Sequence, residues 1–104
     1  MKISIGTAQF DSKYGVNRHK VKLDFLSKKK LIRIASKFKI KTVDTASSYS
    51  NSEYELGKIG LNGFDVITKL PKIKRKNVNL KKWIPQSLDK SLKRLKEKKI
   101  YGLL

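Results

Sequence analysis

The chain has 104 residues, 38% of them hydrophobic, which is enough for the core of one small domain, and it carries a formal net charge of +18. It has no cysteine and one histidine, so disulfides, thiolate metal sites and histidine metal clusters are excluded and no bound metal is expected. No apolar run approaches the ~20 residues of a membrane span, and the N-terminal apolar run is too short for a signal peptide, so we expect a cytoplasmic protein with no membrane partner.

The N-terminal part shows a strand pattern, a polar segment and a helix pattern. Residues 2–5 alternate and stop at Gly6, which predicts a short strand, and the polar residues 7–22 predict a loop. A helix follows, which Asp24 or Ser27 can cap by accepting a hydrogen bond from a free amide of the first turn. Its apolar face has the spacing i, i+3, i+4 and i+7 and consists of Leu31, Ile34, Ala35 and Phe38. We expect the lysines on the opposite, solvated face.

The middle of the chain predicts a second strand and a short helix. The strand covers residues 40–45, which are rich in β-branched side chains. Ser50 and Glu53 have the spacing of a capping box, which predicts the helix start. Gly57 and Gly60 are expected to limit the length of that helix.

The C-terminal part continues the alternation. Residues 64–70 predict a third strand that Pro71 stops, and a basic loop follows. Proline is tolerated only near the first turn of a helix, so Pro85 places the start of the third helix close to Trp83. Residues 100–104 predict a fourth strand. The order β-α-β-α-β-α-β is typical of an α/β protein with a parallel sheet and right-handed crossovers, in a single domain.

Three side chains that could take part in catalysis follow the predicted strands. In parallel α/β architectures functional residues gather at the carboxyl ends of the strands, so Asp44, Tyr49 and Lys69 should meet at one rim. A tyrosine has a reference pKa near ~10, and a neighbouring ammonium favours the phenolate. An aspartate paired to the lysine would keep the ammonium charged and oriented. The set could protonate a carbonyl oxygen while hydride reaches the carbon.

Each of these residues also has an ordinary structural interpretation. Asp44 could cap a turn, Tyr49 could be a surface aromatic, and Lys69 could be one solvated lysine among many. Only their coincidence at the strand ends favours a site.

The charge permits two interpretations as well. A basic protein can bind nucleic acid, or its lysines can simply cover solvated faces. Only four of the 26 basic residues are arginine, although phosphate and base recognition favours the planar arginine fork. The basic clusters at residues 72–76 and 96–99 contain no aromatic residue on which a base could stack. We therefore expect no specific nucleic-acid partner and keep a basic nucleic-acid-binding module as the alternative function.

Four segments of the chain resemble the N-terminal part of the aldo/keto reductase family. They come in family order and span the chain: IGTAQFDSKYGV at 5–16, VDTASSYSNSE at 43–53, VITKLP at 66–71 and SLKRLKEKKIYGLL at 91–104. The family is a (β/α)8 TIM barrel that reduces aldehydes and ketones with NADPH, sometimes NADH. The resemblance implies that residues 1–104 form roughly the first half of such a barrel.

The resemblance also assigns roles to individual residues. Tyr49 takes the general-acid role, and Asp44 and Lys69 match the aspartate and lysine of the family's catalytic tetrad. The residues Gly6, Thr7 and Ala8, together with Asp44, match positions that lie beside the nicotinamide half of the cofactor. The family histidine is expected just after the fourth strand, where this sequence ends at Leu104, and His19 is no substitute.

The departures from the family pattern lead to further expectations. A complete barrel has about 250 residues, so we expect a truncated reductase domain that is inactive alone, or a half barrel completed by a second chain. Its open sheet edges would favour self-association. Ser50 and Lys39 occupy positions where the family usually has glycine. A left-handed backbone at Lys39 would cost about 1 kcal/mol.

Overall fold

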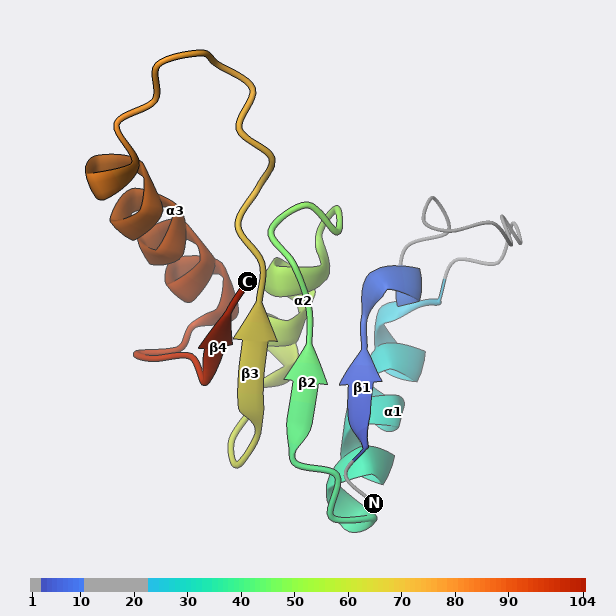
Figure 1. The fold of residues 1–104 in the computed structure, drawn as a ribbon. Coiled ribbons are helices and arrows are strands. Elements are labelled where there is room, and N and C mark those ends of the chain that lie inside the picture. Colours follow the sequence, from blue (N-terminus) through green and yellow to red (C-terminus); the bar gives the residue numbers. More distant parts are fainter. Residues whose placement is uncertain (1–2, 11–22) are drawn as a thin grey trace.

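Four strands form one parallel sheet in a computed structural model that describes residues 3–10 and 23–104. The strands lie in chain order: β1 (Ser4–Gly6), β2 (Thr42–Asp44), β3 (Asp65–Thr68) and β4 (Gly102–Leu103). The helices that connect them are α1 (Phe25–Lys37), α2 (Ser52–Ile59) and α3 (Leu80–Leu95), and a short 3-10 helix, η1 (Ala8–Phe10), follows β1. The two helices α1 and α2 lie behind the sheet (Figure 1). The predicted β/α units of half a TIM barrel are thereby confirmed.

The core fills the space between the sheet and the helices. Its buried apolar side chains come from η1, the three α-helices, the two central strands and the turn after α2, and they are Phe10, Ile32, Val43, Leu56, Leu61, Val66 and Leu95. The sheet register brings the carboxyl ends of neighbouring strands side by side, with Gly6 opposite Asp44 and Asp44 opposite Ile67. The fold therefore creates the rim that the strand pattern predicted.

The buried face of α1 differs from the predicted one. Of the four residues expected on it, only Ala35 is buried, whereas Phe38 is 76% exposed and lines an apolar groove beside β1. The side chains that face the core are those of Ile32 and Lys28. Lys28 can be buried because its ammonium lies 2.5 Å from the carboxylate of Glu55 on α2. The prediction that all lysines of α1 are solvated was wrong, because the partner of Lys28 comes from another helix.

The two ends of α1 follow the sequence more closely. The carboxylate of Asp24 accepts a hydrogen bond from the amide of Ser27 at 2.7 Å, which confirms the N-cap. At the other end the amide of Lys39 donates to Ser36 and the amide of Ile40 donates to Ala35, each at 3.0 Å. This pair of bonds is a Schellman motif, and it requires a left-handed residue, which is Lys39 with φ of 57°.

The starts of α2 and α3 differ from the predictions. The capping box at Ser50 and Glu53 was wrong, because the N-cap is Asn51, which makes no side-chain cap, and the carboxylate of Glu53 is used elsewhere. Helix α3 starts at Leu80 and not near Trp83, so Pro85 lies inside the helix. Proline removes the bond that the carbonyl of residue 81 would accept, and this loss is tolerable because that residue is exposed to water.

Gly57 lies within α2 and does not limit it, contrary to expectation, whereas Gly60 does end the helix with φ of 85°. A Cβ on Gly57 would stand 2.1 Å from the carbonyl oxygen of Arg94 on α3. Glycine is therefore needed for the close approach of the two helices.

The remaining expectations concern the loop and the membrane. Most of the loop predicted at 7–22, including His19, lies outside the described residues. Among the residues that the structure describes, no helix is long and apolar enough to cross a bilayer.

Candidate active site

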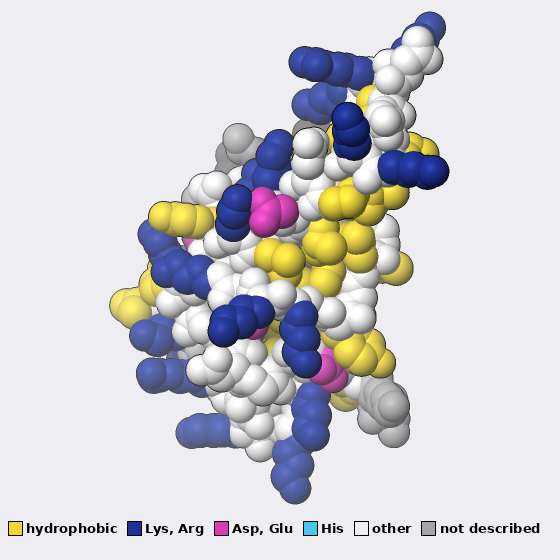
Figure 2. Space-filling view, turned by 90° about the vertical axis from the view of Figure 1, so that its left-hand side faces the viewer, with side chains coloured by type: hydrophobic (Ala, Val, Ile, Leu, Met, Phe, Trp, Pro, Cys, Tyr) yellow, Lys and Arg dark blue, Asp and Glu magenta, His cyan; other side chains and the backbone are white. Residues whose placement is uncertain are grey.

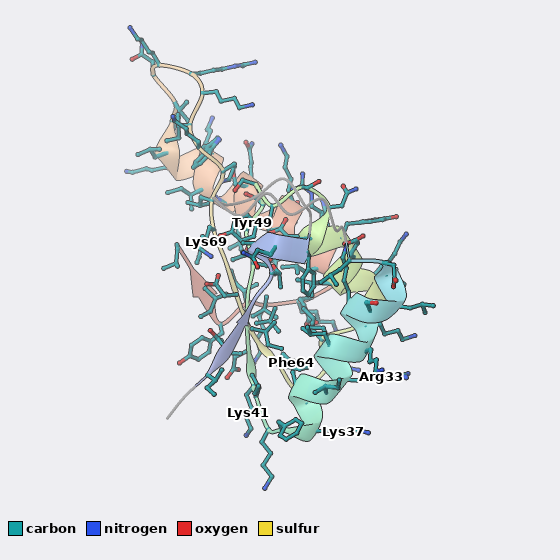
Figure 3. All side chains as sticks on the ribbon, turned by 90° about the vertical axis from the view of Figure 1, so that its right-hand side faces the viewer. Arg33, Lys37, Lys41, Tyr49, Phe64 and Lys69 are labelled. Carbon is teal, nitrogen blue, oxygen red and sulfur yellow. The ribbon has the colours of Figure 1, made fainter. Side chains whose placement is uncertain are left out.

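The three side chains singled out from the sequence meet at the carboxyl end of the sheet. The ammonium of Lys69, just after β3, donates hydrogen bonds to the carboxylate of Asp44 at the end of β2 and, at 3.1 Å, to the backbone carbonyl of Thr45. The same ammonium lies 5.3 Å from the centre of the Tyr49 ring. Figure 3 shows Tyr49 and Lys69 close together, near the middle of the view.

The electrostatic environment of Lys69 favours its charged form. Partial burial lowers the pKa of the ammonium, but the hydrogen bond and the charge of Asp44, with smaller contributions from Tyr49, outweigh this effect. The pKa of Lys69 is therefore raised above its ordinary value. A positive charge is held beside the Tyr49 phenol at neutral pH.

The turn that carries Tyr49 is tied to the neighbouring strand end. The amide of Tyr49 donates to the carbonyl of Ala46 at 3.1 Å, and the amide of Ser52 donates to the carbonyl of Tyr49 at 2.9 Å. The hydroxyl of Ser47 donates to the backbone carbonyl of Lys69 at 2.9 Å. Because the turn and the strand end share these bonds, the phenol and the ammonium are held together.

A buried group of hydroxyls lies beneath the rim. The side chains of Thr7, Thr45 and Ser52 are at most 3% exposed. Ser52 donates to the hydroxyl of Thr7 at 2.9 Å and lies 3.2 Å from that of Thr45. Thr7 in turn binds the backbone carbonyl of Asp44 through both its amide, at 2.9 Å, and its hydroxyl, at 3.2 Å. These bonds join β1, β2 and the start of α2 below Tyr49 and Lys69.

A second buried group supports the end of β3. Glu53 is 2% exposed, and its carboxylate accepts a hydrogen bond from the hydroxyl of Thr68 at 2.7 Å. Its other oxygen accepts from the guanidinium of Arg94 at 3.3 Å. Thr68 directly precedes Lys69, so this ion pair positions the backbone that carries the ammonium. A buried carboxylate is stable here because it is both paired and hydrogen-bonded.

The positions expected beside a nicotinamide ring are Gly6, Thr7, Ala8 and Asp44, and they also lie together at this rim. Among the described residues, no atom would lie within 4 Å of a Cβ placed on Gly6, which pairs with Asp44 in the sheet. Thr7 is completely buried, and its amide and hydroxyl bind the carbonyl of Asp44, so it supports this rim from below.

The sequence identified the three side chains at the rim but missed the buried groups that support them. Thr45, Ser52 and Glu53 belong to the same stretch as Asp44 and Tyr49, so proximity along the chain was the available signal. Their bonds to Thr7, Thr68 and Arg94 connect distant segments and leave no periodic pattern. Within the described residues, no group of three or more His, Cys, Asp or Glu side chains could hold a metal.

Comparisons with known proteins extend this description. The model of the aldo/keto reductase family matches residues 2–102. PA4992, a protein of Pseudomonas aeruginosa assigned to the aldo-keto reductases, has a TM-score of 0.78 at 25% sequence identity, over 97% of this chain and 40% of its own. A second structure of an assigned aldo-keto reductase from this bacterium has a TM-score of 0.75 at 23% identity, covering 97% and 39% of the two chains.

The holo form of aldo-keto reductase AKR11C1 from Bacillus halodurans shares the fold with a TM-score of 0.70 at 17% identity, over 95% of this chain and 33% of its own. The comparison with curated proteins gave no match. The chain thus spans 33–40% of the length of these structures. Because the family model covers nearly all of its residues, the chain belongs to the aldo/keto reductase family.

Proposed function

We propose that this chain carries the proton-donating part of a reductase site for aldehydes or ketones, with Tyr49 as the general acid. The observation that supports this most directly is the position of the Lys69 ammonium between the Asp44 carboxylate and the Tyr49 ring. A proton donor for a carbonyl oxygen needs such a positive charge beside it, because the phenol becomes negative as its proton leaves.

Each side chain has a defined part in this proposal. Tyr49 donates its phenolic proton to the carbonyl oxygen, and solvent later returns a proton to the phenolate. Lys69 stabilises the phenolate, and its raised pKa keeps it charged at neutral pH. Asp44 holds the ammonium in place through their hydrogen bond. A bound nicotinamide cofactor supplies the hydride for the carbonyl carbon.

The family uses nicotinamide cofactors, and we propose NADPH for this chain, with NADH as the alternative. Gly6, Ala8 and Asp44 would lie beside the nicotinamide ring at the end of β1, and the buried Thr7 would support them through its bonds to the carbonyl of Asp44. We further propose that residues 1–104 by themselves turn over no carbonyl substrate, because four strands supply only part of a cofactor site. A reducing, cytoplasmic location suits a chain without cysteine.

The role of Tyr49 can be tested in a chimeric protein. Residues 1–104 would replace the matching 40% of PA4992, and NADPH consumption with an aromatic aldehyde would be followed after far-UV circular dichroism has shown that the chimera folds. Tyr49→Phe should lower kcat by about 10²–10⁴-fold with little change in KM, because general acid catalysis contributes on that scale.

Tyr54→Phe is the matched control, since Tyr54 lies on α2 and is 50% exposed. It should leave kcat unchanged. A folded, active chimera whose kcat survives Tyr49→Phe would disprove the general-acid role. NADPH-dependent turnover by the 104-residue chain alone would disprove the proposed inactivity.

A further inference from the structure

A basic hollow lies outside the candidate active site. The segment 71–79 between β3 and α3 and the first half of α3 enclose about 660 Å³, and Asp44, Tyr49 and Lys69 do not line this space. Six cationic side chains line it: Lys72, Lys74, Arg75, Lys76, Lys82 and Lys90. Lys and Arg side chains gather at the top of Figure 2, where this segment projects from the molecule (Figures 1 and 2).

No acidic residue lines the hollow. Asp89 on α3 forms an ion pair with Lys93 at 2.7 Å, and the neighbouring Lys90 lines the hollow. All six cationic residues are exposed, so none is neutralised by burial against a carboxylate. Six like charges around one concave surface repel each other and produce a strongly positive local potential. A bound anion would relieve this repulsion.

Trp83 lines the same hollow and is the only tryptophan of the chain. The sequence shows no aromatic residue within the basic cluster at 72–76, which counted against stacking of a base. The structure changes this conclusion, because residues 71–79 and Trp83 near the start of α3 line the same hollow, which brings the cluster and the indole ring together. Trp83 is half-buried, which holds the ring in place while part of it remains accessible.

We propose that this hollow, lined by the six cationic side chains and Trp83, binds a nucleotide group. The phosphates would contact the cations, with Arg75 offering the planar fork that suits phosphate oxygens, and the base would stack on Trp83. The volume of about 660 Å³ falls within the ~300–1,000 Å³ that is usual for ligand sites. A purely apolar ligand would make no ionic contact with the cations, and a simple anion would not stack on the indole ring.

The same chemistry can come from a free nucleotide or from single-stranded nucleic acid, and two arms of one experiment distinguish them. The full chain would be titrated at physiological salt with ADP and with an oligothymidylate of about ten nucleotides, a common length for single-strand sites. Trp83 is the fluorescent reporter, and no other tryptophan contributes to the signal. Saturable quenching by ADP would identify a free nucleotide as a ligand, and quenching by the oligonucleotide alone would identify a single strand.

Matched triple variants separate a built site from general charge. Lys74→Gln, Arg75→Gln and Lys76→Gln together should weaken binding at least tenfold. The control triple on α1 is Lys30→Gln, Arg33→Gln and Lys37→Gln. It also removes two lysines and one arginine, all from exposed positions. Figure 3 shows Arg33 and Lys37 at the end of the molecule away from Tyr49 and Lys69. The control triple variant should bind ADP or the oligothymidylate with the same affinity as the unchanged protein.

Three outcomes would overturn the proposal. The first is the absence of saturable quenching in both arms. The second is an equal loss of affinity in the two triple variants, which would mean that binding follows net charge. The third is an affinity for inorganic triphosphate equal to that for ADP, which would mean that the ring makes no contact. Neither NADPH nor a carbonyl substrate is used, so these outcomes are independent of the proposed reductase function.

Discussion

Lys39 and Ser50 have left-handed backbones, with φ of 57° and 48°. The left-handed backbone of Lys39 confirms the geometry that the family resemblance implied for the end of the first helix, whereas that of Ser50 was not predicted. A side chain with a Cβ is strained there, since the left-handed region costs about 1–2 kcal/mol for ordinary residues.

The strain at Lys39 can be measured directly. Lys39→Gly should raise the free energy of unfolding by about 1 kcal/mol, because glycine fits the Schellman motif at the end of α1 without a steric cost. Urea denaturation followed by circular dichroism gives this quantity. Lys37→Gly is the control: it lies inside α1 and should lower the free energy by about 1 kcal/mol. A destabilised Lys39→Gly variant would contradict the strain argument.

The ion pair of Asp44 and Lys69 can be tested through the pKa of Lys69. Asp44→Asn should lower the pKa of Lys69, because burial then acts without the opposing charge and charge-assisted hydrogen bond of Asp44. A pH titration of the lysine side chains by NMR measures this change. Asp89→Asn, which removes the partner of Lys93, should leave the pKa of Lys69 unchanged. A pKa of Lys69 that stays the same in Asp44→Asn would disprove the assigned cause.

The ion pair of Asp44 and Lys69 also makes the stability of the folded chain depend on pH. The pKa of Lys69 is higher in the folded chain than in the unfolded chain, so the protonated ammonium favours the folded state. This contribution is fully present below the ordinary lysine pKa of about 10.4 and is lost as the pH rises through the raised value. The effect is small, since both side chains are partly exposed and solvent screens the pair.

At the scale of elements, the contact between α2 and α3 depends on Gly57. The two helices approach so closely that the backbone of α3 occupies the space where a Cβ would stand. The same helices are joined by the ion pair of Glu53 and Arg94, which also reaches Thr68 at the end of β3. A shift of α2 relative to α3 would therefore disturb the rim.

Gly57→Ala should lower the free energy of unfolding by about 1–3 kcal/mol, as expected for overpacking in a rigid contact. The obstacle is backbone, which cannot move as a flexible side chain would. Gly6→Ala is the matched control, because a Cβ there meets no atom within 4 Å, and it should change stability by less than about 0.5 kcal/mol. Equal effects of the two substitutions in urea denaturation would refute the close approach.

At the scale of the whole molecule, apolar surface and positive charge act against each other. The chain exposes 8289 Å², whereas a compact monomer of 12.0 kDa exposes about 6,000 Å². Part of the exposed apolar surface is the groove between α1 and β1, which Leu31, Ile34 and Phe38 help to line. Figure 2 shows a further apolar patch surrounded by basic side chains. The apolar surface favours association, and the net charge of +18 opposes it.

We therefore expect self-association that increases with salt. Sedimentation velocity should show a larger average mass at 0.5 M than at 0.05 M salt, because screening shortens the reach of the repulsion. Ile34→Gln with Phe38→Gln should reduce the association, since both side chains line the groove. Leu26→Gln, at an exposed position outside the groove, should not. A monomer at every salt and protein concentration would contradict this expectation.

The sequence by itself determined the order of elements and the location of the rim. Alternating β and α patterns require a parallel sheet, and the ends of parallel strands must meet, so Asp44 and Lys69 could be placed together without coordinates. Strand periodicity, turn residues and helix caps are properties of short segments, so a single sequence records them.

Only the tertiary structure decided which side chains are buried and what they contact. Lys28 is buried because Glu55 of another helix reaches it, and Glu53 binds Thr68 and Arg94 and does not cap α2. Trp83 joins the basic residues of segment 71–79 because that segment and α3 line one hollow. Each of these interactions joins two elements, and its energy depends on their packing in three dimensions. Local patterns carry no record of that packing, since hydrophobic and electrostatic contacts depend on distance in space and not on spacing along the chain.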